Sequence, residues 1–131
     1  MVLDASALLA YLQGERGADA VAEALAGGAA VIGAVNWSEA LSKLAERGQD
    51  PDAIAERLEA EGLIGGVLSV MPLMAKDAPL IARLRPPTRA AGLSLGDRAC
   101  LALGITLGLP VITAERLWAD LDLPISVEVI R

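Results

Sequence analysis

The chain has 131 residues and a net charge of −6, with no histidine and a single cysteine. These counts exclude imidazole acid–base catalysis, Ser-His and Cys-His nucleophile pairs, and zinc sites built from Cys and His. The chemistry that remains is carried by carboxylates and a hard cation. The lone Cys100 cannot form an internal disulfide and is typical of the reducing cytoplasm, where we expect the protein to reside.

Length and hydrophobicity predict one domain over residues 1–131. Hydrophobic residues make up 54% of the chain and aromatic residues only 2%, so the core must consist of Ala, Leu, Val and Ile. The start lacks the basic region of a secretion signal, and the longest uncharged stretch is interrupted at Gly108-Leu109-Pro110, so we expect no membrane association. The negative charge argues against nucleic-acid binding driven by overall charge, but allows a local basic rim.

The first half of the chain predicts two strands and four helices. A short buried strand opens the chain, and glycines end the helices that follow. The last two helices of this half are joined by a short polar segment, which predicts a helical hairpin. In chain order the elements are a strand at 2–4, helices at 5–12 and 18–26, a strand at 30–34, and helices at 36–47 and 52–61.

The second half predicts three strands and three helices. Between two of the helices, prolines in the run 85–89 predict an extended loop. The elements are a strand at 67–71, helices at 76–84 and 94–107, a strand at 111–113, a short helix at 115–121 and a last, alternating or edge strand at 125–130. Helices between strands indicate a mostly parallel sheet of four to five strands covered on both faces, a three-layer α/β/α fold.

Four carboxylates stand where helices begin. Asp4, Glu39 and Glu115 each follow a predicted strand, and Asp97 lies in the first turn of the 94–107 helix. Because functional crevices of parallel sheets lie beyond the carboxyl ends of the strands, Asp4, Glu39 and Glu115 belong on the same edge, whereas only the fold can bring Asp97 to them. Capping offers a structural alternative, since Asp4 can cap the first helix, and Asn36 to Glu39 and Ser94 to Asp97 both have capping-box spacing. Taken together, the four favour a cation site.

Four sequence blocks resemble a known family. They are Val2-Leu3-Asp4-Ala5-Ser6-Ala7-Leu8-Leu9, Asn36-Trp37-Ser38-Glu39, Leu93-Ser94-Leu95-Gly96-Asp97-Arg98-Ala99 and Val111-Ile112-Thr113-Ala114-Glu115-Arg116. In this order and at these separations they resemble PIN-domain ribonucleases, specifically the VapC-type toxins of bacterial toxin–antitoxin pairs. The resemblance covers essentially the whole chain.

The resemblance implies a Mg²⁺ or Mn²⁺ site formed by Asp4, Glu39 and Asp97 and completed by Glu115. The family's last block most often reads Thr-Ala-Asp, so Glu115 carries its carboxylate one methylene further out. Ser6, Asn36 and Thr113 resemble supporting polar residues, although each is also a common capping residue. The implied activity is metal-dependent cleavage of RNA phosphodiester bonds by an endoribonuclease toxin.

The same resemblance implies an antitoxin partner, and the apolar composition of the 36–61 helices predicts that they present a surface for that antitoxin and for a homodimer. An acidic nuclease also needs cations along its substrate path. We expect Arg98 and Arg116 to bind substrate, because each directly follows a site acid. Most other cations are expected to be solvated surface charges; the candidates among them are Lys43, Lys76, Arg85 and Arg89.

Two alternatives remain open. A phosphoryl-transfer domain of the receiver or haloacid-dehalogenase type also gathers acids and Mg²⁺ at strand ends. However, Asp4-Ala5-Ser6 lacks the second Asp of the latter type, and no Lys follows the fourth predicted strand as in the former. A degenerate PIN-like domain that only binds a partner is the second alternative, and Glu115 makes it credible.

Overall fold

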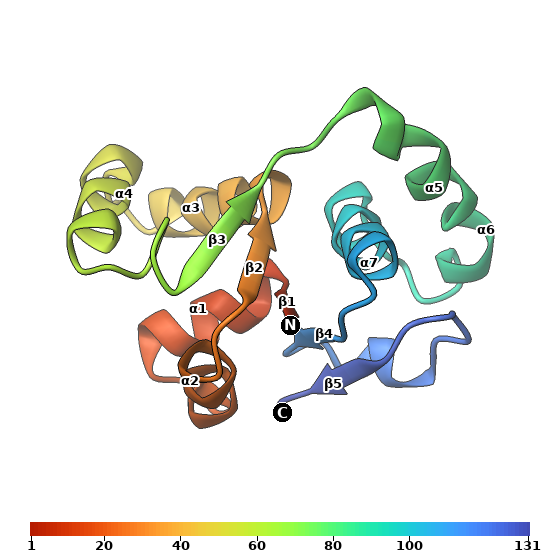
Figure 1. Cartoon of the computed structure of the whole chain (residues 1–131), viewed down its shortest axis with the longest axis horizontal. Helices are drawn as coiled ribbons and strands as arrows, with labels where there is room; N and C mark the ends of the chain where they lie inside the picture. The colour runs from red at the N-terminus through yellow and green to blue at the C-terminus, as the bar shows by residue number, and fades with distance from the viewer.

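A computed structural model describes residues 1–131 as five parallel strands flanked by helices (Figure 1). The strand order is β3-β2-β1-β4-β5, and all four neighbouring pairs are parallel. This confirms the predicted α/β fold with a parallel sheet. The strands are β1 (Val2–Leu3), β2 (Ala30–Gly33), β3 (Leu68–Met71), β4 (Val111–Thr113) and β5 (Val127–Val129).

Helices cover both faces of the sheet. One hydrophobic core is formed between the sheet and helices α1 to α4, and a second between the sheet and α5 to α7 (Figure 1). The helices are α1 (Ala5–Gln13), α2 (Ala18–Ala26), α3 (Ala34–Glu46), α4 (Pro51–Ala60), α5 (Ala78–Arg83), α6 (Arg85–Thr88) and α7 (Leu95–Leu107), with 3₁₀ helices η1 (Ala75–Asp77) and η2 (Arg116–Asp120).

Successive strand residues supply the two cores in turn. Val2 and Val111 pack into the core beneath α7, whereas the adjacent Leu3 and Ile112 pack into the core beneath α1. This is the alternation that strand geometry imposes. Helix α7 approaches the sheet closely at Gly104, where an added Cβ would lie 2.7 Å from Val111 Cγ2 of β4.

The predicted extended loop at 85–89 is wrong, because Arg85–Thr88 forms the short helix α6. Its prolines occupy the first turn, where a missing N–H costs nothing and the fixed φ suits a helix. The fully buried Thr88 donates its hydroxyl to the Leu84 carbonyl at 2.6 Å, and its own carbonyl accepts from Leu93 N. Burial of Thr88 thus selects the helical conformation.

The predicted capping box at Asn36 and Glu39 is also wrong. α3 begins two residues earlier than predicted, with Gly33 as its N-cap, and Asn36 is buried in the first turn. The second predicted box is confirmed: Ser94 N donates to Asp97 Oδ2 at 2.8 Å, and Asp97 N donates to Ser94 Oγ at 3.1 Å. Both segments have capping-box spacing, so the sequence alone could not show which of them forms the box.

The exposed apolar surface does not lie on the helices at 36–61, where the sequence predicted it. α3 and α4 turn their large side chains, such as Leu44 and Leu58, into the core, so their outer faces are polar or small. The exposed large hydrophobic residues are Val67, Leu73, Met74, Leu95, Leu107 and Leu117. None of the helices has the length and hydrophobicity needed to span a bilayer.

Candidate functional site

The four predicted acids line one cavity of about 510 Å³, which we call the acidic cavity. Asp4 stands between β1 and α1, and Glu115 stands just after β4. Glu39 comes from the second turn of α3 and Asp97 from the first turn of α7. Parallel strands end at the same edge of the sheet, which is why residues far apart in sequence meet here.

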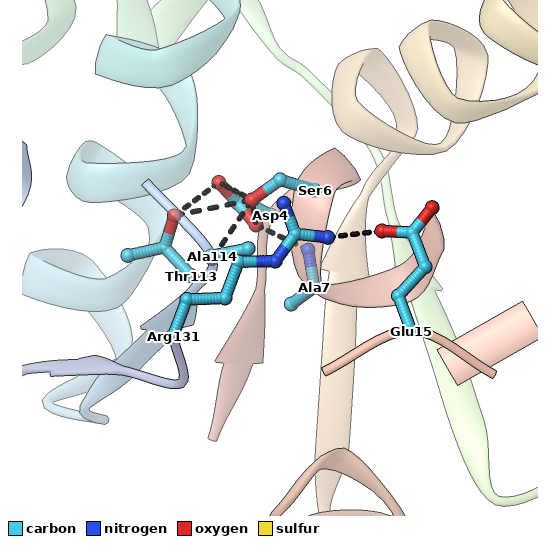
Figure 2. A network of polar contacts seen from close by, with 7 residues as sticks. All are labelled: Asp4, Ser6, Ala7, Glu15, Thr113, Ala114 and Arg131. Carbon is cyan, nitrogen blue, oxygen red and sulfur yellow. Dashed lines mark hydrogen bonds and ion pairs between the residues drawn. The ribbon is translucent and has the colours of Figure 1, made fainter. Parts of the chain in front are cut away.

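Asp4 is the most buried of these acids, with 2% of its surface exposed. Figure 2 shows its carboxylate among three donors. Ala7 N donates to Oδ1 at 2.8 Å and Thr113 Oγ1 donates to Oδ2 at 2.6 Å, while Ser6 Oγ lies 2.8 and 2.9 Å from the two oxygens. Asp4 is therefore both the N-cap of α1 and a member of the acidic cavity.

Ser6 and Thr113 also join two separate turns of the chain. Ala114 N donates to Ser6 Oγ at 2.9 Å, and Glu115 N donates to Thr113 Oγ1 at 3.0 Å. The two hydroxyl oxygens lie 3.3 Å apart. This network holds the β1–α1 junction against the turn that follows β4, so it fixes the backbone positions of Asp4 and Glu115 relative to each other.

Burial and neighbouring carboxylates raise the pKa of Asp4 and of Glu39. Burial is the main cause that raises the pKa of Asp4 to about 6; its hydrogen bonds oppose that rise and the charge of Asp97 adds to it. Burial also raises the pKa of Glu39, with further contributions from Asp97 and Glu115 against the opposing charge of Lys43. The cavity thus carries negative charge that its own cations do not balance.

Asn36 supports the site from outside the acidic cavity. Its Nδ2 donates to the Gly96 carbonyl at 3.0 Å, which ties α3 to the turn that carries Asp97. The absence of a side chain at Gly96 leaves room for Glu39, because a Cβ there would lie 3.3 Å from Glu39 Oε2. Asn36 therefore positions the first turn of α7.

The donor set fits a hard divalent cation. All the donors are carboxylate oxygens, and a bound cation would favour their charged form against the burial, and the lesser repulsion, that raise the pKa of Asp4 and Glu39. No three of the acids lie close enough to contact one ion together. The cavity has room for water between ion and protein, and Mg²⁺ commonly retains several waters in protein sites.

The structure does not bring Arg98 and Arg116 into the acidic cavity. Arg98 Nη1 donates to the Ile81 carbonyl at 3.0 Å, and the side chain lines a separate apolar groove with Leu73, Met74 and Leu95. Arg116 is exposed on η2 and does not line the cavity. Adjacent helical residues point about 100° apart, so a cation next to a site acid in sequence faces elsewhere.

Other cations line the acidic cavity instead, namely Lys43, Arg47 and Arg131. Lys43 is among the candidate cations of the sequence, whereas Arg47 is not; Arg47 follows Glu39 and Lys43 at intervals of four residues, a spacing that could have revealed it. Arg131 forms an ion pair with Glu15 at the cavity (Figure 2). No sequence signal marked that pair, because it depends on the last residues passing close to Gly17, where a Cβ would lie 2.6 Å from the Ile130 carbonyl oxygen.

The chain belongs to the PIN domain family, whose model matches residues 1–123. This confirms the resemblance carried by the four sequence blocks. A comparison with curated proteins finds no match.

Three solved structures share the fold. A toxin–antitoxin complex from Klebsiella pneumoniae is 19% identical over 99% of this chain and 97% of that chain, with a TM-score of 0.72. VapBC2 from Rickettsia felis, bound to a DNA fragment from its promoter, is 14% identical over 99% and 98%, with a TM-score of 0.71. FitAcB from Neisseria gonorrhoeae is 18% identical over 96% and 94%, with a TM-score of 0.70.

Proposed function

We propose that this PIN-domain protein is a divalent-metal-dependent endoribonuclease and the toxin of a toxin–antitoxin pair. The observation that carries the proposal is the convergence of Asp4, Glu39, Asp97 and Glu115, from four separate segments, on one cavity. Family membership and the likeness to toxin–antitoxin structures support the same proposal.

The four acids would hold Mg²⁺ or Mn²⁺, which when bound supplies an acidified water and a polarised phosphoryl oxygen. Ser6 and Thr113 orient the Asp4 carboxylate, and their hydrogen bonds lower its pKa against the effect of burial. Glu115 starts from a backbone N–H tied to Thr113, so its longer arm extends from a fixed point. The chain has no histidine to activate a side-chain nucleophile. None is required, because water can act as the nucleophile in metal-dependent hydrolysis.

The proposal includes an antitoxin as partner, because the similar structures from Klebsiella pneumoniae and Rickettsia felis contain toxin–antitoxin pairs. A guanidinium group from such a partner would find unneutralised carboxylates in the acidic cavity. A homodimer is also part of the proposal, and the molar mass of the purified toxin by light scattering tests it: twice the mass of one chain supports the dimer.

The cleavage test uses purified protein, freed of any partner, with total bacterial RNA and Mg²⁺ or Mn²⁺. Asp4→Asn and Asp97→Asn each remove one carboxylate, and Asp120→Asn is the matched control because Asp120 is exposed outside the cavity. We expect discrete cleavage by wild type and Asp120→Asn only, abolished by EDTA. Cleavage that persists in EDTA or in both cavity variants would reject the proposal.

The alternative functions give different results in the same preparation. A degenerate PIN domain would remain folded and cleave no RNA at any metal concentration. A phosphoryl-transfer domain would hydrolyse a small phosphate ester with Mg²⁺ and leave RNA intact. Of the two alternatives, the longer side chain of Glu115 favours the degenerate PIN domain. If that alternative holds, we expect Glu115→Asp to restore RNA cleavage.

A further inference from the structure

Two cations in the acidic cavity have no ion-pair partner. Lys43 and Arg47 are exposed residues of its lining. The two ion pairs of the structure join Arg57 to Glu61 and Arg131 to Glu15, so the third cation of the cavity is already neutralised. The charge of Lys43 and Arg47 is therefore available to a ligand.

These two cations continue a line that begins at a site acid. Residues four apart stack along one side of a helix, about 6 Å further along its axis at each step. Glu39, Lys43 and Arg47 follow that spacing, and all three line the acidic cavity. Lys43 lies in the last turn of α3, and Arg47 is its C-cap residue. The line thus leads from the acids to the end of α3.

We propose that Lys43 and Arg47, the basic pair, bind consecutive backbone phosphates of the RNA strand next to the phosphate that is cut. The inference rests on the proposed ribonuclease function. A cavity with unneutralised carboxylates repels a polyanion, so the flanking phosphates need cations of their own to hold the strand there. Arg47 can bind a phosphate through two parallel N–H donors, and Lys43 acts as a point charge.

The basic pair also has a purely structural explanation. Cations in the last turn of a helix interact favourably with its dipole, and Lys43 and Arg47 lie at that end of α3. Such a role predicts a change in folding stability and none in RNA affinity. Binding of RNA and its salt dependence therefore separate the two roles, since the dipole interaction does not involve RNA.

The test measures affinity for an uncut single-stranded RNA in an Asp97→Asn background. Lys43→Gln, Arg47→Gln and the double variant are compared by fluorescence anisotropy between 50 and 200 mM salt, conditions over which phosphate contacts are strongly screened. We expect the double variant to bind about tenfold more weakly at the lower salt, and each single variant to reduce the salt slope by about one.

Matched controls are Lys76→Gln and Arg57→Gln, which remove exposed cations outside the acidic cavity. Arg116→Gln tests the cation that sequence adjacency suggested. Thermal unfolding of every variant shows whether the fold is retained.

Loss of affinity confined to the basic-pair variants supports the inference. Equal losses in Lys76→Gln or Arg57→Gln, or a loss only in Arg116→Gln, would overturn it. If wild type cleaves RNA and the double variant binds as tightly as the background protein, the basic pair is rejected and the ribonuclease stands. If wild type neither binds nor cleaves RNA, both proposals fail.

Discussion

The two sides of the first turn of α7 show opposite environments. Asp97 faces the acidic cavity, whereas the next residue, Arg98, lines the apolar groove with Leu73, Met74 and Leu95. The acidic cavity leaves most of its charge without partners of opposite sign. In the groove, Arg98 Nη1 is bonded to a carbonyl, but its Nε is buried without a partner.

The comparison teaches that a residue's neighbours in sequence do not determine the chemistry that it serves. One step along a helix turns a side chain by about 100°. That rotation separates a candidate metal ligand from a cation that packs among apolar side chains.

Substitutions at Asp97 and at the adjacent Arg98 should have different effects on catalysis. We expect Asp97→Asn to lower kcat/KM for RNA cleavage by at least about a hundredfold, because it removes a carboxylate from the candidate metal site. Arg98→Met keeps an unbranched, partly buried side chain and should stay within a few fold of wild type. Cleavage rates under saturating Mg²⁺ test both. A comparable loss of kcat/KM in a folded Arg98→Met protein would show that Arg98 takes part in binding the substrate.

The acidic cavity should also make folding stability depend on pH. The folded state holds the Asp4 proton more tightly than the unfolded state, because the pKa of Asp4 is raised to about 6. Stability should therefore be greatest below the unfolded pKa and fall as pH rises from about 4 to 6.5. A carboxyl pKa raised from 3.8 to about 6 corresponds to roughly 3 kcal/mol of unfolding free energy, which Asp4 alone would contribute at low pH and lose across this range.

Urea unfolding in EDTA, at intervals between pH 4 and pH 7.5, measures this dependence. Asp4→Asn is the control, because it removes the titrating group and should flatten the difference across this window. Two parallel stability curves for wild type and Asp4→Asn would show that Asp4 does not titrate abnormally. Glu39 contributes in the same direction in both proteins, so it cancels from the comparison.

Thr113→Val tests the hydroxyl network that supports Asp4. The side chain is fully buried, and valine keeps its shape but removes both the donor to Asp4 and the acceptor for Glu115 N. We expect a loss of about 2 kcal/mol in unfolding free energy at neutral pH, since buried polar groups lose their partners. A loss smaller than that of Ser38→Ala, whose hydroxyl is exposed, would contradict this role.

The smallest effect is expected in the apolar groove. Leu95 is 64% exposed, so Leu95→Ser should change the free energy of unfolding by less than about 0.5 kcal/mol and leave cleavage unchanged. Chemical denaturation and the RNA assay measure the two quantities. A large destabilisation would mean that Leu95 is covered in solution, and an accompanying fall in molar mass would assign that cover to a second copy.

The sequence by itself determined the strands and the acids. Apolar runs near 2–4, 30–34, 67–71, 111–113 and 125–130 became the five strands. Burial on both faces leaves an apolar run in the central strands β1 and β4, whereas the edge strand β5 shows alternation. The sequence also placed Asp4, Glu39 and Glu115 at one edge, since parallel strands end at the same edge of a sheet. Asp97 lies in the first turn of α7 and follows no strand, so only the fold brought it to the other three.

The supporting residues Ser6, Asn36 and Thr113 could be expected from the sequence blocks. Which cations meet the acids depended on the tertiary structure. Arg98 and Asn36 face away from the acidic cavity, while Lys43, Arg47 and Arg131 face it. The helical form of Arg85–Thr88 likewise depends on the burial of Thr88. In each case, packing between segments that are distant in the sequence sets where a side chain points, and a short stretch of sequence does not contain those contacts.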